Sequence, residues 1–312
     1  MKRVFITSTS FGRTSSEPEK LLVENGWEVC HSEKKNLSDE EIAECIDDFD
    51  AIIVGTDKVG KKTLSKATRL KAIFVHGTGI DNIDLEAAQE ANIPVINAPH
   101  MNACGVAECT FACLLSFIRK IPQAVESIQR GEWCGNQYTG MELNGKTFGI
   151  LGLGHIGLIN ARIAKGFGMS VIYFDAIRSQ SAEAEYGIEY HSKEEVLANS
   201  DFITLHLPLI DATRNFIDAR EFSVMKNNAI LINTSRGGIV NEDALYHAIK
   251  ECKIKGAILD VLETEPMEKE NPLRSLDQVM ITPHIGGYTT ESVTRTSMCI
   301  VNRLLDYFKT ID

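Results

Sequence analysis

Apolar runs and helical repeats alternate through the first hundred residues of the chain. Short apolar segments predict five strands, at 2–8, 27–30, 51–55, 71–75 and 93–97. Between strands, 15–26 and 38–48 have helical patterns, and Ser38 and Glu41 have the spacing of a capping box. Strands that are apolar without alternation are typical of a parallel sheet covered on both faces. This region therefore predicts a doubly wound α/β domain.

A second alternation follows a long helix that is predicted to begin at residue 103. After a looser stretch at 128–146, six apolar segments predict strands, at 147–154, 170–175, 201–208, 229–235, 254–261 and 279–286. Six strands with intervening helices make a full dinucleotide-binding sheet. Residues 289–310 predict a C-terminal helix. The expected fold class is α/β, with two doubly wound parallel-sheet domains.

Composition narrows the class of protein. The chain has 312 residues, enough for two domains, and its 44% hydrophobic and 24% charged residues are ordinary for a globular protein. A net charge of −11 without a strongly basic segment argues against nucleic-acid binding. No apolar run has the length of a signal peptide core or a membrane span. The eight cysteines show neither CxxC pairs nor zinc-ligand spacing, so we expect a cytoplasmic protein without a metal.

The segment ILGLGHIG, which begins at Ile150, has the form of a nucleotide-binding turn between a strand and a helix. Its predicted cofactor-binding residues are Gly152, Gly154, His155, Ile156 and Gly157. Asp175 ends the next strand, 18 residues after Gly157, where its carboxylate can bind ribose hydroxyls and repel a 2′-phosphate. We therefore expect NAD rather than NADP, although Arg178 lies close by. The alternative is a glycine cluster that serves packing alone.

A second glycine-rich loop follows the strand at 71–75. Successive backbone N–H groups of Gly77, Thr78 and Gly79 can form a small anion-binding nest. The composition fits equally well a strained turn that binds nothing. In an open α/β sheet, ligands bind at the carboxyl ends of the strands, which is where this loop lies.

Three further strand ends each carry one residue suited to catalysis: Arg236, Glu265 and His284. Because all three loops follow strands at one sheet edge, the residues can converge on one cleft. Arg236 can bind a carboxylate and polarise a carbonyl, and His284, oriented by Glu265, can transfer a proton. Any one of them alone fits a surface ion pair or a capped loop equally well. Together, beside a nicotinamide, they predict hydride transfer between a 2-hydroxy acid and its 2-oxo acid.

At this point the chain resembles the D-2-hydroxyacid dehydrogenases, especially the short 3-phosphoglycerate dehydrogenases. The resemblance rests on GTGIDNIDLEAA, INAP, VAE, GKTFGILGLGHIG, DFITLHLPL, INTSRGG, LDVLETEP and TPHIGG. It implies a flavodoxin-like substrate domain, formed by 1–100 and 288–312, and a Rossmann NAD-binding domain at 101–287. It also implies a homodimer formed through the cofactor domain.

The resemblance further implies a role for each site residue. Arg236 binds the substrate, His284 and Glu265 transfer the proton, and the loop Gly77–Gly79 holds the substrate carboxylate. Asp260 meets the nicotinamide amide. Other residues of the cofactor groove are His206, Pro208, Thr213 and Thr234.

Departures from the family pattern bear on the substrate. Val75 stands where relatives with phosphorylated substrates often have Arg, and His76 can either line the pocket or only pack. Arg13 and Lys58 can meet a distal anionic group or be merely solvated. Glu265, in place of Gln, argues against formate as substrate, and the chain lacks the regulatory extension of the long forms.

The expected function is NAD-dependent oxidoreduction of a 2-hydroxy acid, with 3-phosphoglycerate as the first candidate substrate. No nucleic-acid or membrane partner is expected. The alternative is an NAD-sensing binding protein, similar to the corepressors that share this fold.

Overall fold

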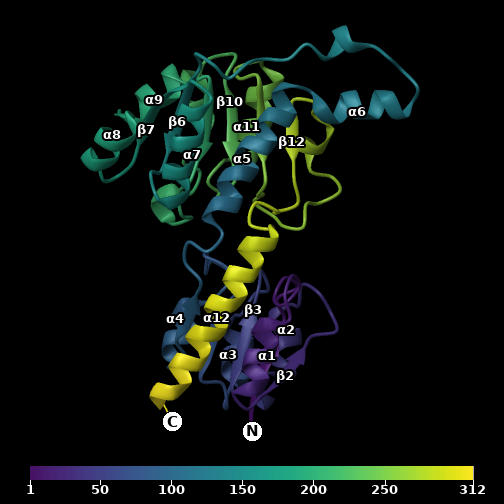
Figure 1. Cartoon of the computed structure of the whole chain (residues 1–312), viewed down its shortest axis with the longest axis vertical. Coiled ribbons are helices and arrows are strands. Elements are labelled where there is room, and N and C mark those ends of the chain that lie inside the picture. The colour runs from purple at the N-terminus through teal and green to yellow at the C-terminus, as the bar shows by residue number, and fades with distance from the viewer. Residues whose placement is uncertain (312) are drawn as a thin grey trace. The chain divides into compact units, whose positions relative to one another are not determined.

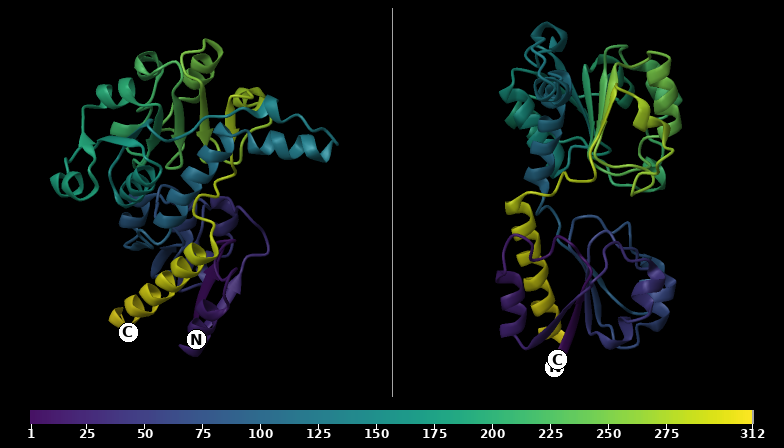
Figure 2. Two further views of the ribbon diagram at one scale, coloured as in Figure 1. Left: turned by 45° about the horizontal axis from the view of Figure 1, so that its top comes forward. Right: turned by 90° about the vertical axis from the view of Figure 1, so that its right-hand side faces the viewer.

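The computed structural model describes residues 1–311 of the chain. The chain divides into two compact units (Figure 1). Unit 1 consists of Met1–Asn102 and Gly287–Asp312, and unit 2 consists of Ala103–Gly286. Within each unit, helices cover both faces of a parallel sheet (Figure 2). The predicted fold class, two doubly wound parallel-sheet domains, is confirmed.

Unit 1 contains a five-stranded sheet in the order β2-β1-β3-β4-β5, which is a flavodoxin-like arrangement. Its strands are β1 (Lys2–Ile6), β2 (Trp27–His31), β3 (Ala51–Val54), β4 (Ala72–Val75) and β5 (Val95–Asn97). Every residue of β3 and β4 is buried. This burial explains why their sequences are apolar throughout rather than alternating.

Helices from both ends of the chain complete unit 1. They are α1 (Glu17–Glu24), α2 (Asp39–Ala43), α3 (Lys61–Lys66), α4 (Leu85–Glu90) and α12 (Thr290–Ile311), with a short 3₁₀ turn at Ile46–Asp48. The capping box that Ser38 and Glu41 predict is formed at the start of α2. The C-terminal helix packs beside α1, where Ile300 and Leu304 are fully buried and Phe308 meets the Trp27 ring edge-on at 4.6 Å. The last helix therefore belongs to the core of unit 1.

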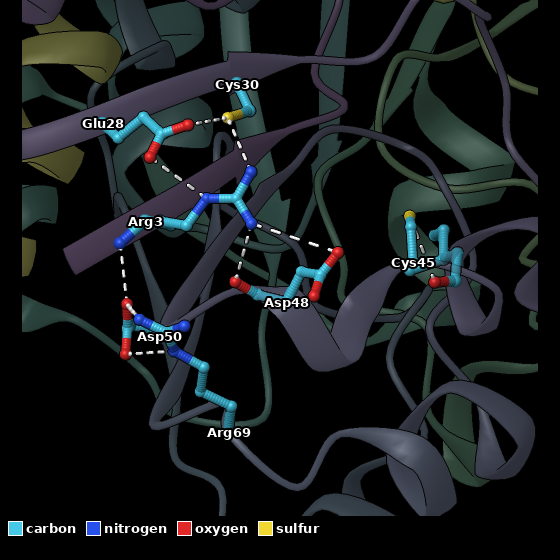
Figure 3. Close-up of polar contacts among 8 residues, drawn as sticks. Arg3, Glu28, Cys30, Cys45, Asp48, Asp50 and Arg69 are labelled. Carbon is cyan, nitrogen blue, oxygen red and sulfur yellow. Dashed lines mark hydrogen bonds and ion pairs between the residues drawn. The ribbon is translucent and has the colours of Figure 1, made fainter. Parts of the chain in front are cut away.

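A polar network fastens the amino ends of the unit 1 strands (Figure 3). Asp50, just before β3, accepts a hydrogen bond of 2.7 Å from the backbone N–H of Arg3 in β1. It also accepts two bonds of 2.9 Å from the guanidinium of Arg69, which precedes β4. Burial raises the pKa of Asp50, but the hydrogen bonds from Arg69 and Arg3 outweigh it and hold the pKa below its usual range. The loops that carry the candidate substrate residues lie at the opposite, carboxyl ends of these strands.

Unit 2 contains a seven-stranded sheet in the order β12-β11-β10-β9-β6-β7-β8. Its strands are β6 (Thr147–Leu151), β7 (Ser170–Phe174), β8 (Glu189–Tyr190), β9 (Phe202–Leu205), β10 (Ile230–Asn233), β11 (Gly256–Leu259) and β12 (Val279–Ile281). The prediction of six strands was wrong by one, because β8 has only two residues and therefore carries no apolar run. The order reverses beside β6, as in a dinucleotide-binding sheet.

The helices of unit 2 differ from the prediction at one point. They are α5 (Ala103–Ile118), α6 (Ile121–Gln129), α7 (His155–Gly166), α8 (Gln180–Tyr186), α9 (Lys193–Asn199), α10 (Ala219–Val224) and α11 (Glu242–Lys250). Short 3₁₀ turns lie at Gly135–Tyr138, Asp211–Thr213 and Pro272–Ser275. The long helix predicted from residue 103 ends at Ile118, and α6 was not predicted. Lys120, with φ of 52°, turns the chain between the two helices, and Pro122 lies in the first turn of α6.

Candidate active site

The centre of the candidate site is a histidine–glutamate pair in unit 2. His284 lies in the loop after β12, and its Nδ1 atom is 2.7 Å from Oε2 of Glu265, in the loop after β11. Oε1 of Glu265 accepts a second hydrogen bond, of 3.0 Å, from the Leu262 backbone N–H. The His284 and Glu265 side chains are 41% and 35% exposed, so a small molecule can reach the pair. The imidazole is therefore oriented through Nδ1 and has Nε2 left for chemistry.

The two partners shift each other's pKa in opposite directions. The hydrogen bond to Glu265 raises the pKa of His284, and the charges of Glu265 and Asp260 add to it, against burial and the charge of Arg236. Burial raises the pKa of Glu265, but hydrogen bonds from His284 and Leu262 and the charges of His284 and Arg236 lower it below its usual range. The pair thus favours imidazolium beside carboxylate. The charge of Arg236 lowers both pKa values.

The backbone around His284 is held by a buried carboxylate. His284 has φ of 53°, in the left-handed region, and its N–H donates to the Asp260 carbonyl at 2.9 Å. The Asp260 side chain, 2% exposed, accepts hydrogen bonds from Thr282 Oγ1 (2.6 Å) and the backbone N–H groups of Ile285 (2.8 Å) and Gly286 (2.7 Å). Both carboxylate oxygens are therefore engaged by the loop that carries His284. The predicted contact of Asp260 with the nicotinamide amide stays a prediction.

The arginine loop is fastened to the glutamate loop by a glycine. Asn233, at the end of β10 and 1% exposed, donates to the Arg236 carbonyl at 2.9 Å and accepts two hydrogen bonds from Ser235. A Cβ atom on Gly237 would lie 1.8 Å from the Leu262 carbonyl oxygen. Only glycine permits this approach, so Gly237 sets the spacing between the Arg236 loop and the loop that leads to Glu265.

The glycine turn lies between β6 and α7, as its motif predicts. A Cβ on Gly152 (φ 99°) would lie 2.5 Å from the His206 carbonyl, and one on Gly157 would lie 2.3 Å from the Gly152 carbonyl. A Cβ on Gly154, at the N-terminus of α7, would meet no atom within 4 Å. His155 and Ile156 form the first turn of that helix. Two glycines thus permit tight packing, and the third leaves open space at a helix N-terminus, which fits a pyrophosphate.

Asp175 lies directly after β7, as predicted, and its carboxylate is tied to the glycine turn. Its Oδ2 accepts a bond of 2.7 Å from the Leu153 N–H, and its Oδ1 accepts one of 3.0 Å from the Ile177 N–H. The side chain is thereby held at the end of the strand beside the turn. This placement fits an adenosine ribose.

The remaining predicted groove residues mainly shape their own loops. The Thr213 hydroxyl donates to the Pro208 carbonyl at 2.5 Å, and Thr234 shares a buried hydrogen bond of 3.0 Å with Thr110 of α5. Nε2 of His206 bonds Thr204 at 3.0 Å, while its Nδ1 is buried without a partner among residues 1–311. Burial lowers the pKa of His206 to about 3, so its ring is neutral. An uncharged ring nitrogen therefore remains on the residue that directly follows β9.

In unit 1 the second glycine loop is built into the sheet edge after β4. The Gly77 N–H donates to the Val75 carbonyl at 2.8 Å, and the Thr78 hydroxyl bonds Asn102 at 3.0 Å. The predicted nest of three N–H groups is therefore reduced, because the Gly77 N–H already has an acceptor. An anion at this loop would use the N–H groups of Thr78 and Gly79.

His76 joins the glycine loop to two neighbouring segments. Its Nδ1 is 3.0 Å from Ser10 Oγ, in the loop after β1, and its Nε2 is 2.8 Å from Ser297 Oγ on α12. Burial lowers the pKa of His76 to about 4, so it is neutral. Of the two roles considered for His76, the structure supports a packing role that fixes the loop.

Lys58 and Arg13 are exposed on the loops after β3 and β1. The Asn82 side chain ties the β3 loop to the glycine loop, because its Nδ2 donates to the carbonyls of Gly55 (3.1 Å) and Asp57 (2.6 Å). The cations that sequence analysis proposed for a distal anion thus lie on loops connected to Gly77–Gly79. Val75 itself is buried in β4 and offers no charge.

The fold and the site define a class of protein: a dinucleotide-binding sheet with a glycine turn, an aspartate after the next strand, and a charged His–Glu–Arg group at the same sheet edge. Residues 111–286 match the family described as D-isomer specific 2-hydroxyacid dehydrogenase, NAD binding domain. The chain belongs to this family. The predicted family and cofactor are confirmed.

Relatives in the family include enzymes with different substrates. The chain is 46% identical to D-3-phosphoglycerate dehydrogenase from Methanocaldococcus jannaschii, over 82% of this chain and 49% of that protein. It is 41% identical to glyoxylate reductase from Thermococcus litoralis, over 86% of this chain and 83% of that protein. D-lactate dehydrogenase from Aquifex aeolicus, solved with NAD and lactic acid, superimposes with a TM-score of 0.86 at 29% identity, covering 99% of this chain and 96% of that one.

The relatives named phosphoglycerate dehydrogenase are longer than this chain. The chain spans about half the length of the first phosphoglycerate dehydrogenases it matches, 49% and 56%.

Among residues 1–311, no helix combines the length and apolarity needed to cross a membrane. Within the same residues, no cluster of three or more metal-ligand side chains is found.

Sequence reasoning missed three residues that support the site. Asn233 and Gly237 flank Arg236, and their roles depend on contacts with other loops. Glu183, on α8, accepts two hydrogen bonds from the guanidinium of Arg178. The sequence does carry a signal for Asn233, which is a polar residue at the end of a fully buried strand. No local pattern identifies Gly237 or Glu183.

Proposed function

We propose that this protein catalyses NAD-dependent interconversion of a D-2-hydroxy acid and its 2-oxo acid. The observation that carries the proposal is the 2.7 Å contact between His284 and Glu265, with Arg236 close enough to influence both pKa values. A proton donor and a fixed cation are the two groups that carbonyl reduction requires from the protein.

Each side chain has a separate task in the proposed reaction. The coenzyme, when bound, would supply the hydride as NADH in reduction and accept it as NAD⁺ in oxidation. In reduction, Nε2 of His284 donates a proton to the developing alkoxide, while Glu265 holds Nδ1 and stabilises the imidazolium. Arg236 stays charged, binds the substrate carboxylate and stabilises the oxyanion. In oxidation, His284 accepts the hydroxyl proton at Nε2.

The first substrate candidate is 3-phosphoglycerate, supported by relatives named for that substrate and by the exposed cations Arg13 and Lys58. Glyoxylate is the competing candidate, because another relative is named glyoxylate reductase. The buried Val75 favours a substrate without a phosphate beside β4. A panel of 2-oxo acids with NADH decides this question. Higher kcat/KM for the phosphorylated acid, reduced in Lys58→Ala or Arg13→Ala, supports phosphoglycerate, whereas equal values remove the reason for it.

The glycine loop of unit 1 is proposed to hold the substrate carboxylate through the N–H groups of Thr78 and Gly79. A proline at position 79 removes one of these donors. Gly79→Pro should therefore raise KM for the 2-oxo acid and leave the Kd of NADH unchanged. An unchanged KM would contradict the role. Retained NADH binding with no turnover on any 2-oxo acid would instead favour the NAD-sensing alternative.

We further propose a homodimer that forms through unit 2. Ile121, Val125 and Ile128 are 48%, 52% and 54% exposed and follow one another at helical spacing on α6, and Trp133 beyond it is 90% exposed. Apolar side chains gathered in this way are typical of an interface. Sedimentation should show a dimer, and Val125→Glu with Ile128→Glu should give a monomer. A monomeric wild type would contradict the proposal.

We propose, from the state of the cysteines, that the protein is located in the reducing cytoplasm. All eight are free thiols, including Cys109 and Cys113, whose sulfurs lie 3.9 Å apart and share a hydrogen bond rather than a disulfide. Titration of eight thiols in the freshly isolated native-source protein under denaturing conditions supports it, and fewer would contradict it.

A further inference from the structure

A cluster of polar contacts surrounds Arg178, in the loop after Asp175. The Arg178 guanidinium makes two hydrogen bonds to Glu183 of α8, from Nε to Oε1 at 2.9 Å and from NH2 to Oε2 at 2.7 Å. Its Cζ atom lies 5.4 Å from the centre of the Tyr190 ring, on β8. Arg178 is therefore held from two sides.

Glu183 has its own anchor in the core. Its Oε1 atom accepts a hydrogen bond of 2.9 Å from the hydroxyl of Tyr173, a residue of β7 that is fully buried. The hydrogen bonds from Arg178 and Tyr173 lower the pKa of Glu183, with Arg178 having the larger effect. The Glu183 side chain is only 18% exposed, whereas that of Arg178 is 53% exposed. The pair is thus fixed at the glutamate end and faces solvent at the arginine end.

The position of Arg178 matters because of the residue that precedes its loop. Asp175 lies three residues earlier, where the adenosine ribose of a bound dinucleotide is recognised. Tyr190 contacts both residues, since its hydroxyl donates to the Asp175 carbonyl at 3.5 Å. An arginine in this loop is the residue type that binds a 2′-phosphate, through a planar fork of donors. Asp175 would repel the same phosphate.

We propose that Glu183 determines cofactor choice by pairing with Arg178, so that the ribose site presents the Asp175 carboxylate and an arginine whose charge is already compensated. The site then binds NAD in preference to NADP. Nε and NH2, which form one two-donor face of Arg178, are already bonded to Glu183, so a 2′-phosphate must break two charge-assisted hydrogen bonds to use that face. This inference rests on cofactor binding by the family domain and is independent of which 2-oxo acid is reduced.

The test compares dissociation constants of NADH and NADPH, measured by nicotinamide fluorescence without substrate. Glu183→Ala should release Arg178 and lower the dissociation constant of NADPH by about tenfold. The dissociation constant of NADH should change by less than about threefold. Glu183→Gln keeps the shape and the Tyr173 bond but loses the charge, so its NADPH affinity should lie between those of wild type and Glu183→Ala. Tyr173→Phe is the control, because it removes the hydrogen bonds of the Tyr173 hydroxyl with Glu183 and with the Ser179 N–H but keeps both residues of the ion pair. Its NADPH to NADH ratio should equal that of wild type.

The double variant Glu183→Ala with Arg178→Ala identifies the cause. If Arg178 is the released group, the double variant loses the gain in NADPH affinity. A gain that persists without Arg178 would overturn the proposal, and so would an unchanged ratio in both Glu183 variants. Weaker NADH binding without a gain for NADPH would show that Arg178 pairs with Asp175 instead, which also overturns it. Circular dichroism confirms that each variant is folded.

Discussion

Asp260→Asn tests whether the buried carboxylate of Asp260 holds the loop that carries His284. Asparagine has nearly the same volume but only one acceptor oxygen. If that oxygen keeps its bonds to Thr282 and Ile285, the amide nitrogen faces the Gly286 N–H, now 2.7 Å from Oδ2. One charge-assisted bond is then lost, and two others become neutral.

The size of the effect follows from these three bonds. Losing a hydrogen bond to a charged acceptor costs about 2 kcal/mol, and converting the other two to neutral bonds costs about 1 kcal/mol each. Removing a buried charge is favourable and offsets part of this loss, so the free energy of unfolding should fall by about 3 kcal/mol. With a urea m value of about 2 kcal/mol/M, the unfolding midpoint of unit 2 should fall by about 1.5 M. Thr282→Val, the control, removes one bond and should lower the midpoint by about half as much.

The assay is urea unfolding followed by far-ultraviolet circular dichroism, together with amide hydrogen exchange at Ile285 and Gly286. Exchange at both residues should become faster in Asp260→Asn, and kcat should fall, because His284 loses the support for its left-handed backbone. A midpoint equal to that of wild type would refute the reasoning. It would leave Asp260 with a role toward the cofactor alone, since that role predicts no loss of stability in the free protein.

Four other substitutions test the site. His284→Ala should lower turnover by about 10²–10⁴-fold with little change in the Kd of NADH, and near wild-type turnover would exclude it as the proton donor. Glu265→Gln removes the charge that raises the pKa of His284, so reduction should decline at lower pH than in wild type; an unshifted pH profile would contradict the pairing. Asp175→Ala should weaken the binding of NADH and reduce the ratio of NADH to NADPH affinity, both measured by titration. A wild type that binds NADPH more tightly than NADH would refute this. Gly237→Ala forces its Cβ against the carbonyl of Leu262 and should cost about 1–3 kcal/mol of stability and lower kcat, measured by unfolding and turnover; an unaltered kcat would argue that the loop spacing is unimportant.

Elements with a local signal could be predicted, and those that depend on distant partners could not. The strands and the glycine turn at Gly152 are visible because burial and backbone geometry dictate residue types over short stretches. The β8 strand has two residues and no such signal. Asp260 is an example at the site: its acceptor role depends on backbone N–H groups 25 and 26 residues later, and backbone donors are the same for every sequence.

Arg178 is a second residue whose contacts could not be predicted from the sequence. Its nearness to Asp175 was apparent from the numbering alone. Its actual partner is Glu183, which also accepts a hydrogen bond from the buried Tyr173 hydroxyl. Side-chain contacts between residues five and ten positions apart leave no periodic pattern in the chain.

The division of the chain at Asn102 and Gly287 has a consequence for how this protein can diverge. Every residue assigned to proton transfer and coenzyme recognition lies in unit 2, whereas Arg13, Lys58 and the loop Gly77–Gly79 lie in unit 1. Under the proposed function, mutations in unit 1 are expected to alter which acid is accepted, while the redox residues of unit 2 are inherited unchanged. Chimeras that exchange unit 1 between this chain and a relative should inherit acid preference from one parent and coenzyme preference from the other.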